Sequence, residues 1–152
     1  MRVSFDNSGF DVIKEALKDN YKTRVGILGS KGSEQRDGLT NAEIGAIHEF
    51  GSLTRGIPRR SFLKNPLEDN IMKWVKNNAD TYKNLMEKGN LKKWYVALGF
   101  EAEKIIDNAF SSGYDWEPLK QSTIDKKGSD KILIDTGELR RAISSKVMNA
   151  ND

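Results

Sequence analysis

The sequence predicts an α+β fold with few strands and with helices that include a long antiparallel helical hairpin. Residues 21–29 alternate, so that every second side chain can face one way, as in a strand. Residues 61–87 and 91–110 instead repeat apolar side chains at helical steps, and a short link joins the two stretches. The 152 residues fit one domain, so we expect residues 1–152 to fold as a single unit.

The composition excludes several kinds of catalytic and metal site. The chain has no cysteine, which excludes disulfides, thiolate zinc sites and cysteine nucleophiles. It has one histidine, His48, so a metal site or mechanism that needs two histidines of one chain is excluded as well. The 25 basic and 22 acidic residues leave a net charge of +3, which is a weak argument for a dedicated DNA-binding protein.

Signals for membranes or secretion are not found in the sequence. No apolar run approaches the roughly 18 residues of a membrane span. The first ten residues, MRVSFDNSGF, lack the apolar centre of a signal peptide. We therefore expect the chain to stay in the cytoplasm in which it is made, with no membrane partner.

The first part of the chain predicts a helix, a strand and a polar loop. Residues 10–19 place apolar side chains at helical spacing, and Asn20 can end that helix. The strand over 21–29 has Tyr21, Thr23, Val25 and Ile27 on one side. The polar, glycine-containing stretch that follows predicts a mobile loop over about 29–40.

A capping box predicts the next helix. Thr40 and Glu43 have the spacing at which the hydroxyl and the carboxylate each satisfy the other residue's amide. The helix that they open, NAEIGAIHEF, has Ile44, Ile47 and Phe50 near one side. Gly51 is suited to end it with a positive φ. Pro58 keeps the residue before it extended, so residues 52–60 predict an ordered, extended loop.

The long hairpin and the C-terminal segment complete the prediction. Asn77 and Asn78 weaken the middle of the first long helix and predict a kink there, while Trp74 and Trp94 fit the apolar stripes of the core. The C-terminal segment predicts a short helix near 119–127 and a strand at SSKVM, residues 144–148. Asp135 and Glu138 have the spacing of a second capping box. We expect residues 111–152 to be partly flexible before assembly.

No pattern of residues predicts catalysis. His48 and Glu49 are neighbours in sequence, so their side chains do not face each other on a helix, and an ordinary helical role is favoured. Glycines 26, 29 and 32 do not have the spacing of a dinucleotide-binding loop. The carboxylates of 115–138 alternate with lysines and arginines, as on a solvated face, and form no dyad for a hydrolase. We therefore expect no enzyme activity, metal or cofactor.

The most distinctive cluster is Arg55, Arg59 and Arg60. Residues 52–76 hold six basic and two acidic side chains, a local net charge of +4. Arginine suits carboxylate and phosphate contacts, so a protein interface, a DNA-facing surface and plain solvation are all open, with the protein interface favoured. Phe62 follows the arginines as an apolar step. The candidate interface residues also include Trp116, which either anchors the C-terminal segment on the helices or meets a partner.

Two segments carry a resemblance to a known family. One is VGILGS…TNAEIGAIHEFGSLTRGIPRRSFLKNPLEDN, residues 25–70, and the other is WEPLKQSTIDKKGSDKILIDTGELRRAIS, residues 116–144. Together and in this order they resemble the small neck proteins of tailed bacteriophages, which are head–tail joining, tail-completion or virion-morphogenesis proteins. Ser61 stands where the family often has a proline, and it can cap the helix that follows.

The resemblance implies an α+β fold in which a small, mostly antiparallel sheet packs against helices. It also implies a structural virion protein that is assembled in the host cytoplasm and has no catalytic activity. It implies rings, usually sixfold, with the isolated chain expected to be a monomer. The implied partners are further copies of the chain, a neighbouring neck or portal-side protein, and a tail-tube or tail-terminator protein; passing DNA would be held weakly. Which ring of the neck this would be stays open. The alternative hypothesis is a nucleic-acid-binding module that uses the basic stretch 55–76.

Overall fold

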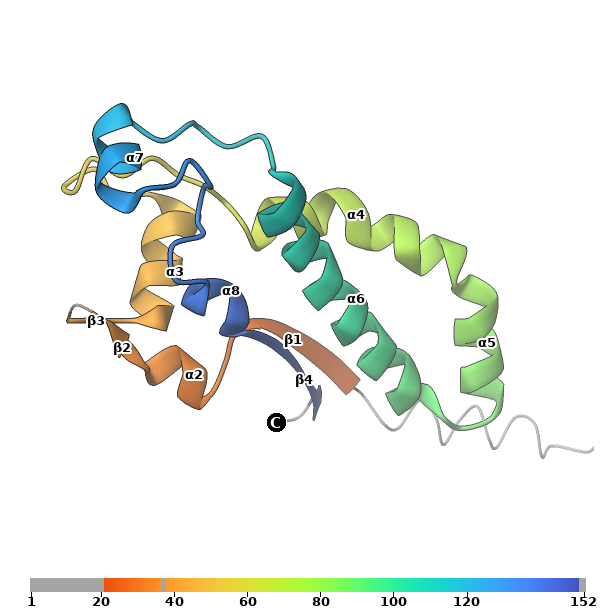
Figure 1. Cartoon of the computed structure of the whole chain (residues 1–152). Helices are drawn as coiled ribbons and strands as arrows, with labels where there is room; N and C mark the ends of the chain where they lie inside the picture. The colour runs from red at the N-terminus through yellow and green to blue at the C-terminus, as the bar shows by residue number, and fades with distance from the viewer. Residues whose placement is uncertain (1–20, 37, 151–152) are drawn as a thin grey trace, which may run out of the picture.

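The computed structural model describes residues 21–36 and 38–150, and its fold is α+β, as predicted (Figure 1). The helix predicted over 10–19 lies outside the described residues. In chain order the elements are β1 (Tyr21–Ile27), α2 (Ser30–Ser33), β2 (Gln35–Arg36), β3 (Leu39–Thr40), α3 (Asn41–Phe50), α4 (Lys64–Asn77), α5 (Ala79–Glu87), α6 (Leu91–Ser112), α7 (Gln121–Lys127), α8 (Glu138–Arg141) and β4 (Ile143–Asn149).

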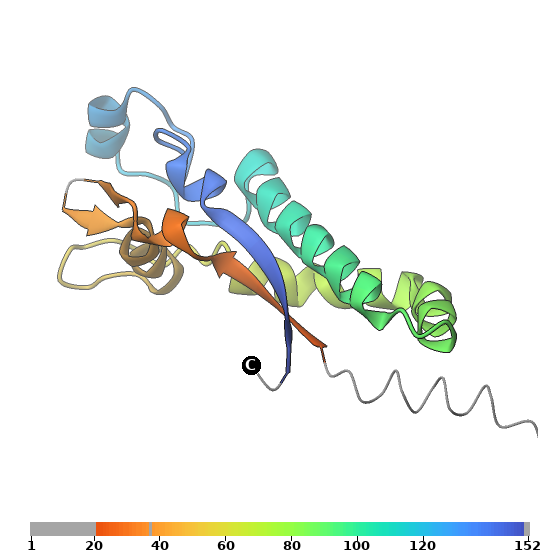
Figure 2. The same ribbon diagram turned by 90° about the horizontal axis from the view of Figure 1, so that it is seen from below.

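The two predicted long strands pair with each other. β1 and β4 are antiparallel, in a register that runs from Tyr21 opposite Asn149 to Ile27 opposite Ile143. One face of this ribbon packs on α6 (Figure 2). Gly99 of α6 permits the close approach, because a Cβ there would lie 2.6 Å from the hydroxyl oxygen of Ser145. The pairing therefore joins the start of the described chain to its end.

The helical hairpin forms as the apolar stripes predict. α6 returns along α4 and α5 (Figure 1), and the predicted kink lies at Asn78, whose side chain donates to the carbonyl of Trp74. The ring of Trp94 lies 4.9 Å from that of Trp74 and 5.2 Å from that of Tyr82. This aromatic cluster holds the two arms together at the end of the hairpin far from α3. No helix within the described ranges is long and apolar enough to cross a membrane.

The main core lies at the other end of α6. It joins the loop before α4, the C-terminal half of α6 and the segment that leads into β4. Its buried members are Phe62, Ile106, Ala109, Phe110, Trp116 and Leu139. The two sequence segments that carry the family resemblance therefore meet in one core.

Among the local predictions, one is confirmed and several are corrected. The stretch predicted as a loop contains α2 and the β2–β3 hairpin; its mobility stays a prediction. The capping box of Thr40 and Glu43 is formed. Phe50 was expected on the apolar side of its helix, but it is 75% exposed, because the buried position at this end belongs to Glu49. The second capping box was wrong, since α8 begins after Gly137, which is left-handed, and not after Asp135.

Replacing Trp94 by alanine tests the hairpin core. Trp94 is 5% exposed. We expect Trp94→Ala to lower the free energy of unfolding by about 3–5 kcal/mol, because it removes a large buried side chain and leaves a cavity. Urea unfolding measures this loss. The control Phe100→Ala, on the same helix but exposed, should cost under about 1 kcal/mol. Equal losses for the two variants would contradict the packing described here.

Candidate functional site

The carboxylate of Glu49 joins the end of α3 to the start of α4. Glu49 is buried, and its two oxygens accept four hydrogen bonds. Oε1 accepts from the Ser61 hydroxyl at 2.6 Å and from the Lys64 amide at 3.2 Å. Oε2 accepts from the amides of Phe62 and Leu63 at 2.9 and 3.0 Å. A buried carboxylate with this many donors is stably held, because each donor replaces a lost contact with water.

These hydrogen bonds provide acceptors for the backbone amides around the start of α4. The first amides of a helix have no partner inside it, and here those of Leu63 and Lys64 point at one carboxylate, which also accepts from the Phe62 amide just before the helix. The next amide, of Asn65, donates to the Ser61 hydroxyl at 3.1 Å, and Pro66 has no amide hydrogen. Ser61 was expected to cap this helix; the N-cap position belongs to Leu63 instead, but the Ser61 hydroxyl does provide the acceptor for one amide of the first turn. The negative charge also lies where the helix dipole favours it.

The backbone carbonyls at the end of α3 accept hydrogen bonds from the same loop. The carbonyl of His48 accepts from the amide of Arg60 at 2.7 Å, and the carbonyl of Glu49 accepts from Nε of Arg59 at 3.2 Å. Gly51 makes this return possible: its φ is +78°, and a Cβ there would lie 3.0 Å from the Arg59 nitrogen. The end of α3, the loop and the start of α4 thus form one hydrogen-bonded unit, which we call the α3–α4 junction.

The C-terminal segment is fixed on the α3–α4 junction by two side chains. Arg60 is 5% exposed; its Nε donates to the carbonyl of Glu117 at 2.9 Å and its Nη2 to that of Pro118 at 3.2 Å. Trp116 returns the contact, since its indole nitrogen donates to the carbonyl of Ser61 at 3.1 Å. Together these bonds cross 55 residues or more of sequence and place the chain that leads to α7.

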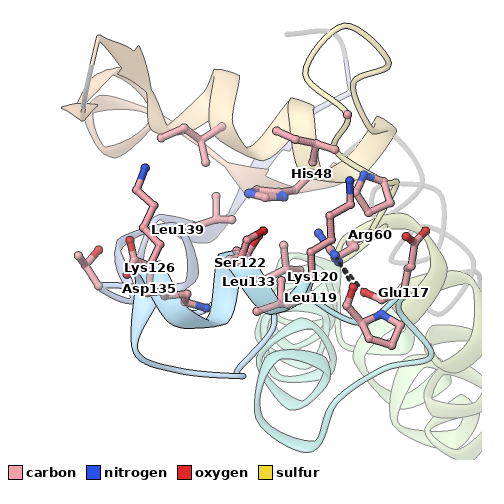
Figure 3. Close-up of a pocket in the computed structure, with 18 of the residues that line it drawn as sticks. His48, Arg60, Glu117, Leu119, Lys120, Ser122, Lys126, Leu133, Asp135 and Leu139 are labelled. Atoms are coloured by element: carbon pink, nitrogen blue, oxygen red, sulfur yellow. Dashed lines mark hydrogen bonds between the residues drawn. The ribbon is translucent and has the colours of Figure 1, made fainter.

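An open pocket of about 710 Å³ lies between α3, α7 and the segment that precedes α8 (Figure 3). Its walls combine apolar side chains, among them Ile44, Leu133 and Leu139, with groups of both charges. The lysines come from α7 and the residue before it, and the carboxylates of Asp135 and Glu138 come from the segment that leads into α8 and from α8 itself. A wall of mixed charge suits a polar or peptide ligand better than a single strong anion.

Two cations of the pocket are affected by burial. The pKa of Arg60 is lowered by desolvation, which the charge of Glu117 partly offsets. The pKa of Lys127 is also lowered, first by desolvation and then by the nearby charge of Arg60, while Asp135 opposes the shift. Arginine stays protonated even so, and it therefore contributes a permanent positive charge to the pocket wall.

A short hairpin turn projects from the α3–α4 junction, and we call residues 52–57 the loop tip. Ser52 and Ile57 exchange two backbone hydrogen bonds at 2.8 and 2.9 Å, so the turn is ordered. It holds Leu53 fully exposed, with Arg55 exposed beside it and Phe50 exposed just before it. An ordered turn that presents leucine, phenylalanine and arginine to solvent is typical of a protein contact.

The five candidate interface residues fall into two groups. Arg55 and Arg59 are exposed, as expected. Phe62 is fully buried and Trp116 is 9% exposed. Arg60 is buried as well, because the chain at residues 116–118 covers it. The expected contact surface is therefore corrected for these three, because they hold the fold of the chain itself. For Trp116 the structure favours the first of its two interpretations, an anchor for the C-terminal segment.

Comparison of the chain with models of protein families, with curated proteins and with solved structures found no significant match. The described residues contain no group of three or more His, Asp or Glu side chains that could hold a metal ion. The pocket and the loop tip are therefore assessed on their own geometry.

Sequence reasoning missed Glu49 and the structural role of Arg60. Glu49 was assigned an ordinary helical role. A signal was present: an acidic residue directly before a helix stop, followed at 61–64 by a helix start whose amides need acceptors. The pairing could not be deduced, because the loop between the two sites sets which donors the carboxylate meets.

Replacing Glu49 by glutamine tests the α3–α4 junction. The amide keeps the shape but places an N–H₂ against backbone N–H donors. We expect Glu49→Gln to lower the free energy of unfolding by about 2–4 kcal/mol, because charged, buried hydrogen bonds are lost. Urea unfolding checks this. The matched control is Glu68→Gln, an exposed partner of Lys64, which should change stability by about 0.5 kcal/mol or less. A loss from Glu49→Gln no larger than that of the control would refute the assigned role.

Replacing Arg60 by lysine tests the anchor of the C-terminal segment. Lysine keeps the charge but cannot reach two carbonyls with one planar fork. We expect amide hydrogen exchange in α7 and the residues around it to rise about tenfold, since the loss of one hydrogen bond is worth about that factor locally. Exchange in the middle of α6 should stay the same. Arg59→Lys is the control, and an equal response in α7 would argue against a specific anchor.

Proposed function

We propose that this chain is a structural protein of the neck of a tailed bacteriophage. It forms a ring that joins head and tail or completes the tail, and it has no catalytic activity. The observation that carries this proposal is the loop tip, an ordered turn that presents Leu53 and Arg55 beside the exposed Phe50. Such a turn costs solubility in a chain that acts alone, and it is suited to a chain that assembles.

The contacts of the motif residues support a structural role. The residues that carry the resemblance to neck proteins, such as Glu49, Arg60 and Trp116, form hydrogen bonds that connect segments of the chain. Each has its polar groups engaged with backbone or hydroxyl partners. Residues that are hydrogen-bonded in this way stabilise the fold of the chain, and a ring subunit needs a defined fold in order to contact its neighbours.

The loop tip also fits the geometry of a ring. A subunit of a closed ring meets its two neighbours through two different surfaces, so a projecting element on one side must enter a recess on the other. The loop tip borders the open pocket, whose lining includes Gly56 and Ile57, so the two together would form one of these two surfaces. The partners are then further copies of the chain, with neck or tail-tube proteins above and below the ring.

The experiment is complementation of a phage from which the gene is deleted. We expect the deletion to leave filled heads and free tails that do not join, as seen by negative-stain electron microscopy. The wild-type gene should restore joined particles. Wild-type particle yield from the deletion itself would end the proposal.

A variant of the loop tip sharpens the same experiment. Leu53→Asp should fold with an unchanged melting temperature, because the side chain is fully exposed, yet fail to restore joined particles. The control Met72→Asp also places a carboxylate at an exposed apolar position, on α4 rather than on the loop tip. Equal complementation by the two variants would remove the loop tip from the contact.

A further inference from the structure

One face of the β1–β4 ribbon is turned away from α6, and its residues range from the exposed Arg24 and Lys146 to the buried Gly26. The opposite face is set against α6, as the hydrogen bond from the Thr23 hydroxyl to the carbonyl of Tyr95 shows. Because side chains alternate along a strand, the residues between the α6-facing ones point away from the helix. In the observed register these are Lys22, Arg24 and Gly26 of β1, opposite Met148, Lys146 and Ser144 of β4. We call this surface the basic face (Figure 2).

The charges on the basic face have one sign. Neither β1 nor β4 contains an aspartate or glutamate. Arg24 lies directly opposite Lys146, both are exposed, and Lys22 is the next residue of β1 on this face. Like charges directly opposite each other destabilise a sheet, so this arrangement works against the fold.

We propose that the basic face binds the phosphate backbone of nucleic acid. A two-stranded antiparallel ribbon has the width that the major groove of duplex DNA admits. Lys22 and Arg24 are two residues apart on one strand, about 6.8 Å, so they form a regular row of cations along the ribbon. Phosphates would also relieve the repulsion between Arg24 and Lys146.

An acidic protein surface is the less favoured occupant. The buried centres of protein interfaces are rich in aromatic side chains and poor in lysine, whereas this face has two lysines and an arginine beside one methionine, a serine and a glycine, and no aromatic side chain. The exposed apolar residues expected of a protein contact are Leu53 on the loop tip and Phe50 just before it. Protein contact and phosphate contact therefore belong to different parts of the surface.

The basic face also differs from the 55–76 stretch that the sequence suggested for nucleic acid. In that stretch Arg60 is buried, Arg59 is hydrogen-bonded to the end of α3, and Lys64 is paired with Glu68 at 3.7 Å. The basic face brings its cations together by strand pairing instead. The inference goes beyond the neck function and does not depend on ring formation.

The test is a titration of the full chain into a labelled DNA duplex of about 20 base pairs, followed by fluorescence anisotropy. With three phosphates contacted, log K should fall against log salt with a slope near −3, or about 40-fold between about 50 and 200 mM. The variant Arg24→Gln/Lys146→Gln should reduce the slope by about 2. It should weaken binding by at least about tenfold at the lower salt concentration. Its melting temperature should not fall, because a repulsive pair is removed.

The control variant is Arg55→Gln/Lys76→Gln, which loses the same charge from exposed residues of the 55–76 stretch. It should leave the slope unchanged. Poly-glutamate of matched charge, used as a probe for acidic protein, should bind more weakly than DNA. The proposal is overturned by the absence of DNA binding at low salt, by equal losses in the two variants, or by equal affinity for poly-glutamate.

Discussion

The fold depends on one buried negative charge. The Glu49 carboxylate supplies acceptors for the amides at the start of α4, which otherwise would be buried without partners. This fixes where α4 begins, and α4 is the first arm of the hairpin against which α6 packs. It also fixes Ser61 and Phe62, the residues that meet Trp116 and the core of α6. A single side chain thus connects the helical hairpin, the loop tip and the C-terminal segment.

The α3–α4 junction determines which polar groups remain for function. Arg59 and Arg60 are adjacent in a basic sequence, yet both donate to backbone carbonyls. The α3–α4 junction leaves the loop tip exposed to solvent. The junction also holds the loop tip rigid, because hydrogen bonds join the chain on either side of the tip. Apolar side chains on a rigid turn lose little entropy when a partner covers them, so they can contribute more to binding than the same residues on a mobile loop.

The sequence predicts local features well and distant ones poorly. The capping box of Thr40 and Glu43 spans three residues, so its geometry follows from helix spacing alone, and it is formed. The stripe containing Trp94 is likewise a property of one helix. The contacts of Glu49 span 12 to 15 residues and those of Arg60 span 57 and 58. Nothing in the local pattern selects these partners, because loop closure and packing decide which donors reach which acceptors.

The distribution of charge also differs between the sequence and the folded chain. The 55–76 stretch has the higher density of basic residues along the chain, and folding disperses them into a junction, an ion pair and separate exposed positions. Lys22 and Arg24 attract no notice in the sequence because Lys146 lies more than a hundred residues away. Strand register places Arg24 and Lys146 opposite each other, at the 4.5–5.5 Å Cβ separation typical of such pairs. A polyanion responds to the charges that share a surface, and strand pairing places Arg24 and Lys146 on one surface although they are far apart in the sequence.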